Sequence, residues 1–155
     1  MEKRSNEMKN EVGIGGWLIL VLIGLIITPI RLGITLSSDF FPIINSMSLL
    51  DAYPSLQIMI YTEGIGNIIF GISAIILLIM MSNKDRRFPK LMIVFYVSNL
   101  IFVLVDAIYA TQIPIIEQFV SSDDSLKEVV RAIIGTAIWV PYMMVSTRVK
   151  RTFVK

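Results

Sequence analysis

The sequence predicts an all-α, polytopic membrane protein: one bundle of four transmembrane helices with both termini in the cytoplasm. Apolar residues make up 55% of the 155 residues and charged residues only 17%, an apolar share above and a charged share below those of ordinary soluble domains. Four apolar runs, near residues 14–36, 58–81, 91–113 and 126–146, each have about the twenty residues that a helix needs to cross a bilayer. Basic residues gather in alternate connections, the pattern that sets orientation in a membrane.

The first span follows a partly basic leader, residues 1–12. Its apolar run is longer than a signal-peptide core and no small-residue cleavage site follows, so we interpret it as a span of the mature protein. The span contains Pro29 and Arg31. A proline inside a helix removes one backbone hydrogen bond and predicts a kink. An arginine in hydrocarbon must be paired, snorkel to the surface or serve a function.

The second and third spans are each preceded by a proline, Pro54 and Pro89. Both suit the first turn of a helix, where the missing amide proton costs nothing. The spacing of polar residues within each span places them on one helix face, opposite the lipid-facing isoleucines and leucines. The residues concerned are Glu63, Asn67, Asn99 and Asp106.

The fourth span begins with a capping-box sequence, in which Ser125 and Glu128 are expected to satisfy early amides of the helix reciprocally. This motif predicts a helix that starts at Leu126. The span carries Arg131, and Pro141 predicts a second kink near its end. The transmembrane domain is therefore expected over residues 13–147, with a basic cytoplasmic tail over 148–155.

The orientation rests on the placement of the basic residues. Eleven of the fourteen fall in the leader, the second connection and the tail: Lys3, Arg4, Lys9, Lys84, Arg86, Arg87, Lys90, Arg148, Lys150, Arg151 and Lys155. The long connection after the first span has no basic residue. The positive-inside rule therefore places both termini in the cytoplasm, and we expect a multi-pass protein of the bacterial inner membrane.

One charged residue from each span falls at a similar depth. A rise of about 1.5 Å per residue places Arg31, Glu63, Asp106 and Arg131 in the outer part of a hydrocarbon core about 30 Å thick. We expect Arg31 to face a carboxylate across the bundle, within a polar chamber that opens outward. The alternative is that some of these side chains snorkel to the outer headgroups. The candidate intramembrane polar cluster comprises Arg31, Glu63, Asn67, Asn99, Asp106 and Arg131.

The composition argues against several kinds of chemistry. The chain has no cysteine and no histidine, which excludes disulfides, thiolate nucleophiles and Ser-His catalysis. The glycines of "GIGGW" (Gly13–Trp17) lack the spacing of a dinucleotide-binding loop, and they are better explained by close packing at the start of the first helix. The basic tail sits beside a span, where it acts on topology and on lipid rather than on nucleic acid. We expect no catalytic residues, no metal and no cofactor.

Two segments resemble the bacterial family known as domain of unknown function 2569: "GIGGWLILVLIGLIITPIRL" and "AIWVPYMMVSTRVKRTF". Members look like small inner-membrane proteins with four helices, an opening Gly-Gly-Trp-Leu segment and a closing Trp-x-Pro-Tyr segment followed by basic residues. The resemblance implies the fold and the membrane location, but no reaction, substrate or site. The positions that match are Gly15, Gly16, Trp17, Leu18, Trp139, Pro141, Tyr142 and Arg148.

Three functions remain open. The first is a non-enzymatic structural, accessory or regulatory component that associates with itself or with another membrane protein through helix faces rich in small residues. The second is a small transporter or channel that uses the polar cluster. The third is an enzyme acting on a lipid-linked substrate with Glu63 and Asp106 as an acid/base pair. Two neighbouring arginines would lower the pKa of both carboxyls, which argues against this third function.

Overall fold

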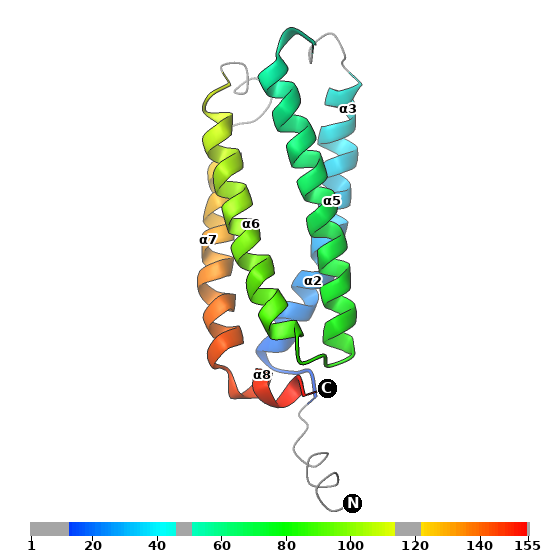
Figure 1. The fold of residues 1–155 in the computed structure, drawn as a ribbon, viewed down its shortest axis with the longest axis vertical. Coiled ribbons are helices and arrows are strands. Elements are labelled where there is room, and N and C mark those ends of the chain that lie inside the picture. Colours follow the sequence, from blue (N-terminus) through cyan, green and yellow to red (C-terminus); the bar gives the residue numbers. More distant parts are fainter. Residues whose placement is uncertain (1–12, 46–50, 114–121, 155) are drawn as a thin grey trace, which may run out of the picture.

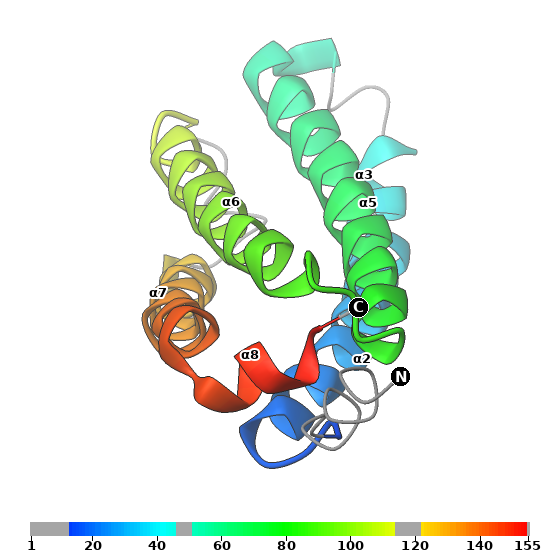
Figure 2. The same cartoon turned by 60° about the horizontal axis from the view of Figure 1, so that its bottom comes forward.

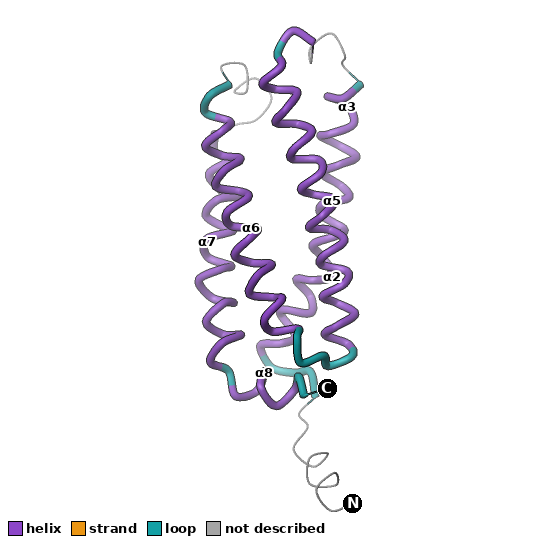
Figure 3. The backbone as a smooth tube through the Cα atoms, viewed as in Figure 1, coloured by secondary structure: helices purple, strands orange, loops and turns teal. Residues whose placement is uncertain are grey.

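The computed structural model describes residues 13–45, 51–113 and 122–154, and these ranges are helical apart from short turns, with no strand among them (Figure 3). The long helices are α2 (Trp17–Thr35), α5 (Pro54–Ser82), α6 (Phe88–Ala110) and α7 (Ser122–Val145). A short π-helix, η1 (Leu36–Phe40), and α3 (Phe41–Ile44) continue the chain directly from α2. Among the described residues, four helices are long and apolar enough to cross a membrane, which confirms the prediction of an all-α protein with four spanning helices.

The helix ends follow local sequence signals in part. Pro54 and Pro89 lie in the first turns of α5 and α6, as predicted. The capping-box prediction was wrong, because α7 begins at Ser122 rather than after Ser125. The sequence Ser-Asp-Asp at residues 122–124 supplies acidic residues that favour the start of a helix. Pro29 and Pro141 lie inside α2 and α7, which continue past them. The leader, residues 1–12, lies outside the described residues.

The long helices form two pairs. α2 packs against α5, α6 packs against α7, and α5 and α6 join the pairs (Figure 1). α2 and α7, the first and last long helices in the chain, are not among the extensively packed pairs in the described structure. We call the boundary between them the α2–α7 seam.

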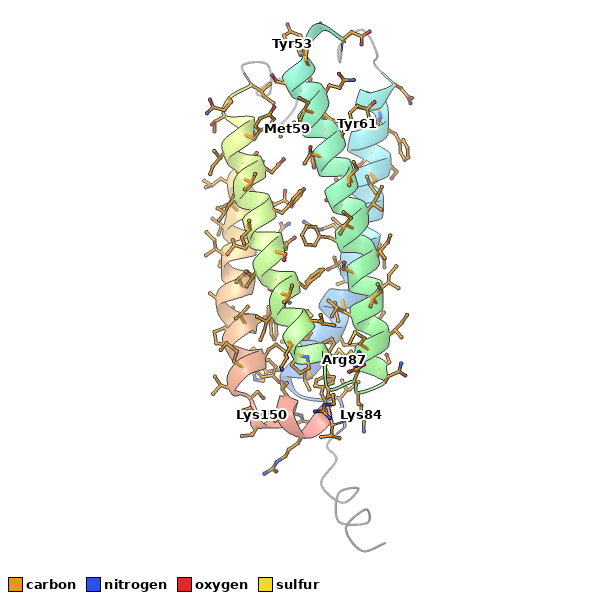
Figure 4. The ribbon with its side chains drawn as sticks, viewed as in Figure 1. Tyr53, Met59, Tyr61, Lys84, Arg87 and Lys150 are labelled. Carbon is orange, nitrogen blue, oxygen red and sulfur yellow. The ribbon has the colours of Figure 1, made fainter. Side chains whose placement is uncertain are left out.

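The two ends of the bundle differ in charge. One end holds the start of α2, the turn between α5 and α6, and the C-terminal end of the chain (Figure 1). Lys84, Arg87 and Lys150 lie there, whereas Tyr53 lies at the opposite end (Figure 4). We call these the basic end and the distal end.

A further helix, α8 (Thr147–Thr152), covers the basic end (Figure 2). This segment was expected only to be part of a basic tail. The Ser146 hydroxyl caps α8 by accepting a hydrogen bond from the Val149 amide, with 3.4 Å between the two atoms. Phe153, just after α8, stacks on Phe88 of α6, with 4.5 Å between ring centroids. The tail is therefore packed onto the bundle through its apolar side chains.

The buried core is concentrated toward the basic end. Leu18, Val21 and Leu25 of α2 pack there with Leu77 of α5 and Met143 of α7. A smaller buried cluster toward the distal end joins Leu56, Met59 and Ile60 of α5 to Ala110 of α6. Between them, aromatic rings of α5 and α6 meet: Phe70 lies 5.7 Å from Phe95 and 5.5 Å from Phe102, measured between ring centroids. Aromatic rings therefore occupy the middle of the α5–α6 interface.

Candidate functional site

Arg31, the charged residue within the first span, forms an ion pair. Its Nη2 lies 3.6 Å from Oε1 of Glu128. Arg31 comes from the distal half of α2 and Glu128 from the first turns of α7, so the pair bridges the α2–α7 seam. The side chains remain 45% and 51% exposed. The pair is therefore at the perimeter of the bundle rather than in an enclosed chamber.

The carboxylate that Arg31 contacts was not in the predicted polar cluster. Sequence reasoning assigned Glu128 to a capping box, but α7 starts one turn earlier and leaves its carboxylate free to reach α2. Because residues 128, 135 and 142 are seven apart, they lie on one face of α7. Glu128 lies seven residues before Gly135, on the same helix face. This spacing is the sequence signal that could have added Glu128 to the cluster.

The structure places the other predicted cluster residues on three helices. Glu63 and Asn67 lie partly buried on α5, Asn99 and Asp106 lie partly buried on α6, and Arg131 is exposed on α7. Asp106 is close enough to Glu128 for their charges to interact, but in the described part of the chain neither Asp106 nor Arg131 forms an ion pair.

Aromatic side chains occupy part of the space between α5 and α6 where an outward-opening polar chamber was predicted. The ring of Phe102 lies directly over Gly66 of α5, where an added Cβ would overlap it. Phe70 completes the contact from the next turn of α5. Asn67 and Asn99 therefore share their stretch of the α5–α6 interface with large apolar rings.

A second cluster forms at the basic end, where the start of α2 meets the end of α7. Trp17 of α2 and Trp139 of α7 make an edge-to-face contact with 6.4 Å between ring centroids. Tyr142 lies 5.9 Å from Trp139 in the same geometry. Leu18, next to Trp17, is completely buried in the core. Offset and edge-to-face aromatic pairs are favourable arrangements, and these hold the start of α2 against the end of α7.

Arg148 of α8 completes this second cluster. Its guanidinium lies on the backbone of Gly15 and Gly16, so that a Cβ on Gly15 would come within 2.5 Å of its Nη2. Gly16, the residue that precedes α2, has φ +59°, a conformation that favours glycine. We call the group of Gly15, Gly16, Trp17, Trp139, Tyr142 and Arg148 the terminal clasp.

The terminal clasp brings together the two sequence segments that resemble the family named above. "GGW" and the Trp-x-Pro-Tyr segment with its following arginine are about 120 residues apart in the chain, yet they form one contact region across the basic end of the seam. Among the described residues, no group of three or more Asp or Glu side chains is arranged to hold a metal ion.

A comparison with family models identifies the family of the chain. The model described as "Protein of unknown function (DUF2569)" matches residues 11–154, a range that includes both clusters. No curated protein and no solved structure shows significant similarity to the chain.

Proposed function

The chain belongs to the family of proteins of unknown function DUF2569, and from that premise we propose that it is a non-enzymatic membrane component that works by binding a second copy of itself or another membrane protein. In this proposal its membrane is the cytoplasmic membrane of a bacterium, with the basic end in the cytoplasm. The absence of histidine and cysteine from the sequence supports a non-enzymatic role, because these residues supply much of catalytic chemistry.

The observation that carries the proposal is the half-exposed ion pair between Arg31 and Glu128. Arg31 lies fourteen residues after Trp17, a rise of about 21 Å along α2. With Trp17 at the interface, this depth is inside a hydrocarbon core about 30 Å thick. Charged side chains exposed to lipid at this depth are costly. A partner helix laid over the pair removes that exposure.

The surface beside the pair also suits a helix. Gly24 is exposed, and nothing lies within 4 Å of the position that its Cβ would take. Thr28, one turn further, hydrogen-bonds back to the Gly24 carbonyl, with 2.8 Å between the two oxygens. Small residues four apart let the backbones of two membrane helices approach closely. The α2 surface beside the seam therefore presents small residues on which a partner helix can pack, next to the ion pair.

The test is the mass of the assembly released from native membranes in a mild polymer, with every co-purifying protein identified. We expect a homo-oligomer or a stoichiometric partner. The double variant Arg31→Leu, Glu128→Leu should reduce the assembly to the single chain, because it removes both charges together. The conservative double variant Ile30→Leu, Ile134→Leu, at exposed positions of the same helices, should leave it intact. A single chain from unmodified membranes would overturn the proposal.

A small transporter or channel is the second candidate, favoured by Asp106. This carboxyl is partly buried on a membrane-spanning helix, near the charge of Glu128, and such residues often line pathways for ions or protons. The aromatic rings between α5 and α6 argue against a pathway through one chain, so conduction would require an oligomer.

Flux into proteoliposomes separates the two candidates. If the protein conducts, Asp106→Asn and Glu63→Gln should each reduce the flux severalfold, whereas Asp85→Asn, in the turn at the basic end, should not. Flux that is absent from the unmodified protein, or unchanged in both variants, would rule out this mechanism.

A further inference from the structure

The basic end carries a strong local excess of positive charge. Asp85 is the one acidic residue in residues 83–90 and 146–154, and its carboxylate accepts a hydrogen bond from the Arg87 backbone amide, 2.7 Å away. The basic residues in these ranges are Lys84, Arg86, Arg87, Lys90, Arg148, Lys150 and Arg151. Such a surface attracts anionic lipid headgroups in general.

Arg148 is exposed, and its guanidinium lies against the backbone at the start of α2. Val149 and Thr152 on the same short helix are buried, which sets the rotation of α8 about its axis. The Arg148 guanidinium lies over two glycines, with Nη1 3.4 Å from the position of a Cβ on Gly16. Its side chain donates no hydrogen bond and forms no ion pair to any described residue. A guanidinium in this place, whose donors no described residue uses, is well suited to bind phosphate.

The surface next to Arg148 changes from polar to apolar in the order of a phospholipid. Trp17 follows Gly15 and Gly16 directly and is 63% exposed. Exposed tryptophan is typical of the level between headgroups and acyl chains. About 10 Å further along α2, the open surface at Gly24 begins. Phosphate-binding, interfacial and acyl-contacting groups thus follow one another along the α2–α7 seam.

We propose that the terminal clasp binds one anionic phospholipid, with the phosphate on the Arg148 guanidinium and an acyl chain along the seam between Trp17 and Gly24. The positive field of the basic end selects an anionic headgroup, and the guanidinium fixes its place. The lipid would connect the start of α2 to α8 and α7. This inference is independent of the proposed assembly, because a single chain carries the whole site.

The test is native mass spectrometry of the purified full chain with phosphatidylglycerol and, separately, with phosphatidylcholine of the same acyl chains. We expect one retained phosphatidylglycerol per chain and much weaker retention of phosphatidylcholine. Gly15→Ala should weaken phosphatidylglycerol retention about fivefold, because its Cβ pushes the guanidinium away without changing any charge. Gly13→Ala is the matched control, since its Cβ would meet nothing within 4 Å.

A second pair of variants separates a fixed site from diffuse attraction. Arg148→Gln should weaken retention at least as much as Gly15→Ala, whereas Arg151→Gln on the same helix should have little effect. Equal losses from Arg148→Gln and Arg151→Gln, or unchanged retention in Gly15→Ala, would overturn the proposal. Displacement of the lipid by millimolar inorganic phosphate at constant ionic strength would also overturn it, because the site would then bind a soluble anion.

Discussion

At the scale of single residues, the glycines separate close helix contacts from open helix faces. A Cβ on Gly66 would overlap the Phe102 ring, which is itself packed on Phe70. A Cβ on Gly24 or Gly33 would meet nothing within 4 Å. In lipid, where helices do not gain from excluding water from one another, such close contacts supply much of the packing energy. Gly66 is therefore needed for close packing between α5 and α6, whereas Gly24 and Gly33 lie on open helix faces.

Gly66→Ala should destabilise the bundle by about 1–3 kcal/mol, the usual effect of overpacking. The Phe102 ring cannot simply turn away, because Phe70 lies against it. The free energy of unfolding in detergent, followed by circular dichroism during a denaturant titration, measures the effect. Gly33→Ala is the control and should not destabilise the bundle, because alanine favours a helix more than glycine does and its Cβ would meet nothing within 4 Å. Equal stability of the two variants would contradict the contact between Gly66 and Phe102.

At the scale of elements, α8 ties the last segment of the chain to the helices at the basic end. Its buried residues and the stacked Phe153 connect the last segment of the chain to α6. Phe153 is 5% exposed, although it lies beyond the last spanning helix. The fastening therefore depends on apolar packing outside the transmembrane helices.

Phe153→Ala should cost about 3 kcal/mol of stability, as truncation of a buried phenylalanine usually does. It should also release α8, so that trypsin cleaves after Lys150 and Arg151 faster than in the unmodified protein. Limited proteolysis in detergent micelles, followed by mass spectrometry, measures this. Val154→Ala, at an exposed neighbouring position, should leave the cleavage rate unchanged. Equal protection of α8 in Phe153→Ala would show that the stacking does not hold it.

The ion pair across the seam makes a separate prediction about α2 and α7. Arg31→Met and Glu128→Gln should be less destabilising together than the sum of the two single effects. The coupling free energy should be about 0.5–2 kcal/mol, the range found for polar contacts between membrane helices. A double-mutant cycle by denaturant titration measures it, with exposed Ile30→Met in place of Arg31→Met as the control. Strict additivity for Arg31 and Glu128 would show that the pair contributes nothing.

The elements also show what the sequence could and could not predict. The four spans follow from apolar length alone, and the prolines mark the starts of α5 and α6 correctly. Arg31 was expected to face a carboxylate, but Glu128 was misassigned because a capping box and an interhelical ion pair use the same residue types. α8 was missed because six residues with a single apolar side chain, Val149, carry no periodicity long enough to recognise. The terminal clasp depends on contacts between distant segments, which no local pattern specifies.

At the scale of the whole molecule, two helix pairs are joined more firmly on one side than on the other. The α5–α6 interface has a buried cluster and an aromatic group, whereas the α2–α7 seam is bridged by the terminal clasp and by the ion pair. The seam is therefore the side on which both proposals place their partners: a helix toward the distal end and a lipid toward the basic end.

The orientation of the whole molecule is itself a prediction, and the sequence makes it easy to test. The positive-inside rule places the basic end in the cytoplasm, where the inner leaflet supplies anionic headgroups for the proposed lipid site. Because the chain has no cysteine, a single introduced cysteine reports its own location without background. Asn83 and Ser55 are exposed positions near the basic and distal ends, respectively.

In intact cells, a membrane-impermeant maleimide should label Ser55→Cys, and it should label Asn83→Cys only after the membrane is permeabilised. A permeant maleimide should label both variants, which controls for intrinsic reactivity. The opposite pattern would place the terminal clasp at the outer surface. It would leave the geometry of Arg148 unchanged but move the proposed lipid to the other leaflet. If both sites were labelled from outside before permeabilisation, the two ends of α5 would lie on the same side of the membrane. That result would show that α5 does not span the membrane, and it would contradict the bundle topology.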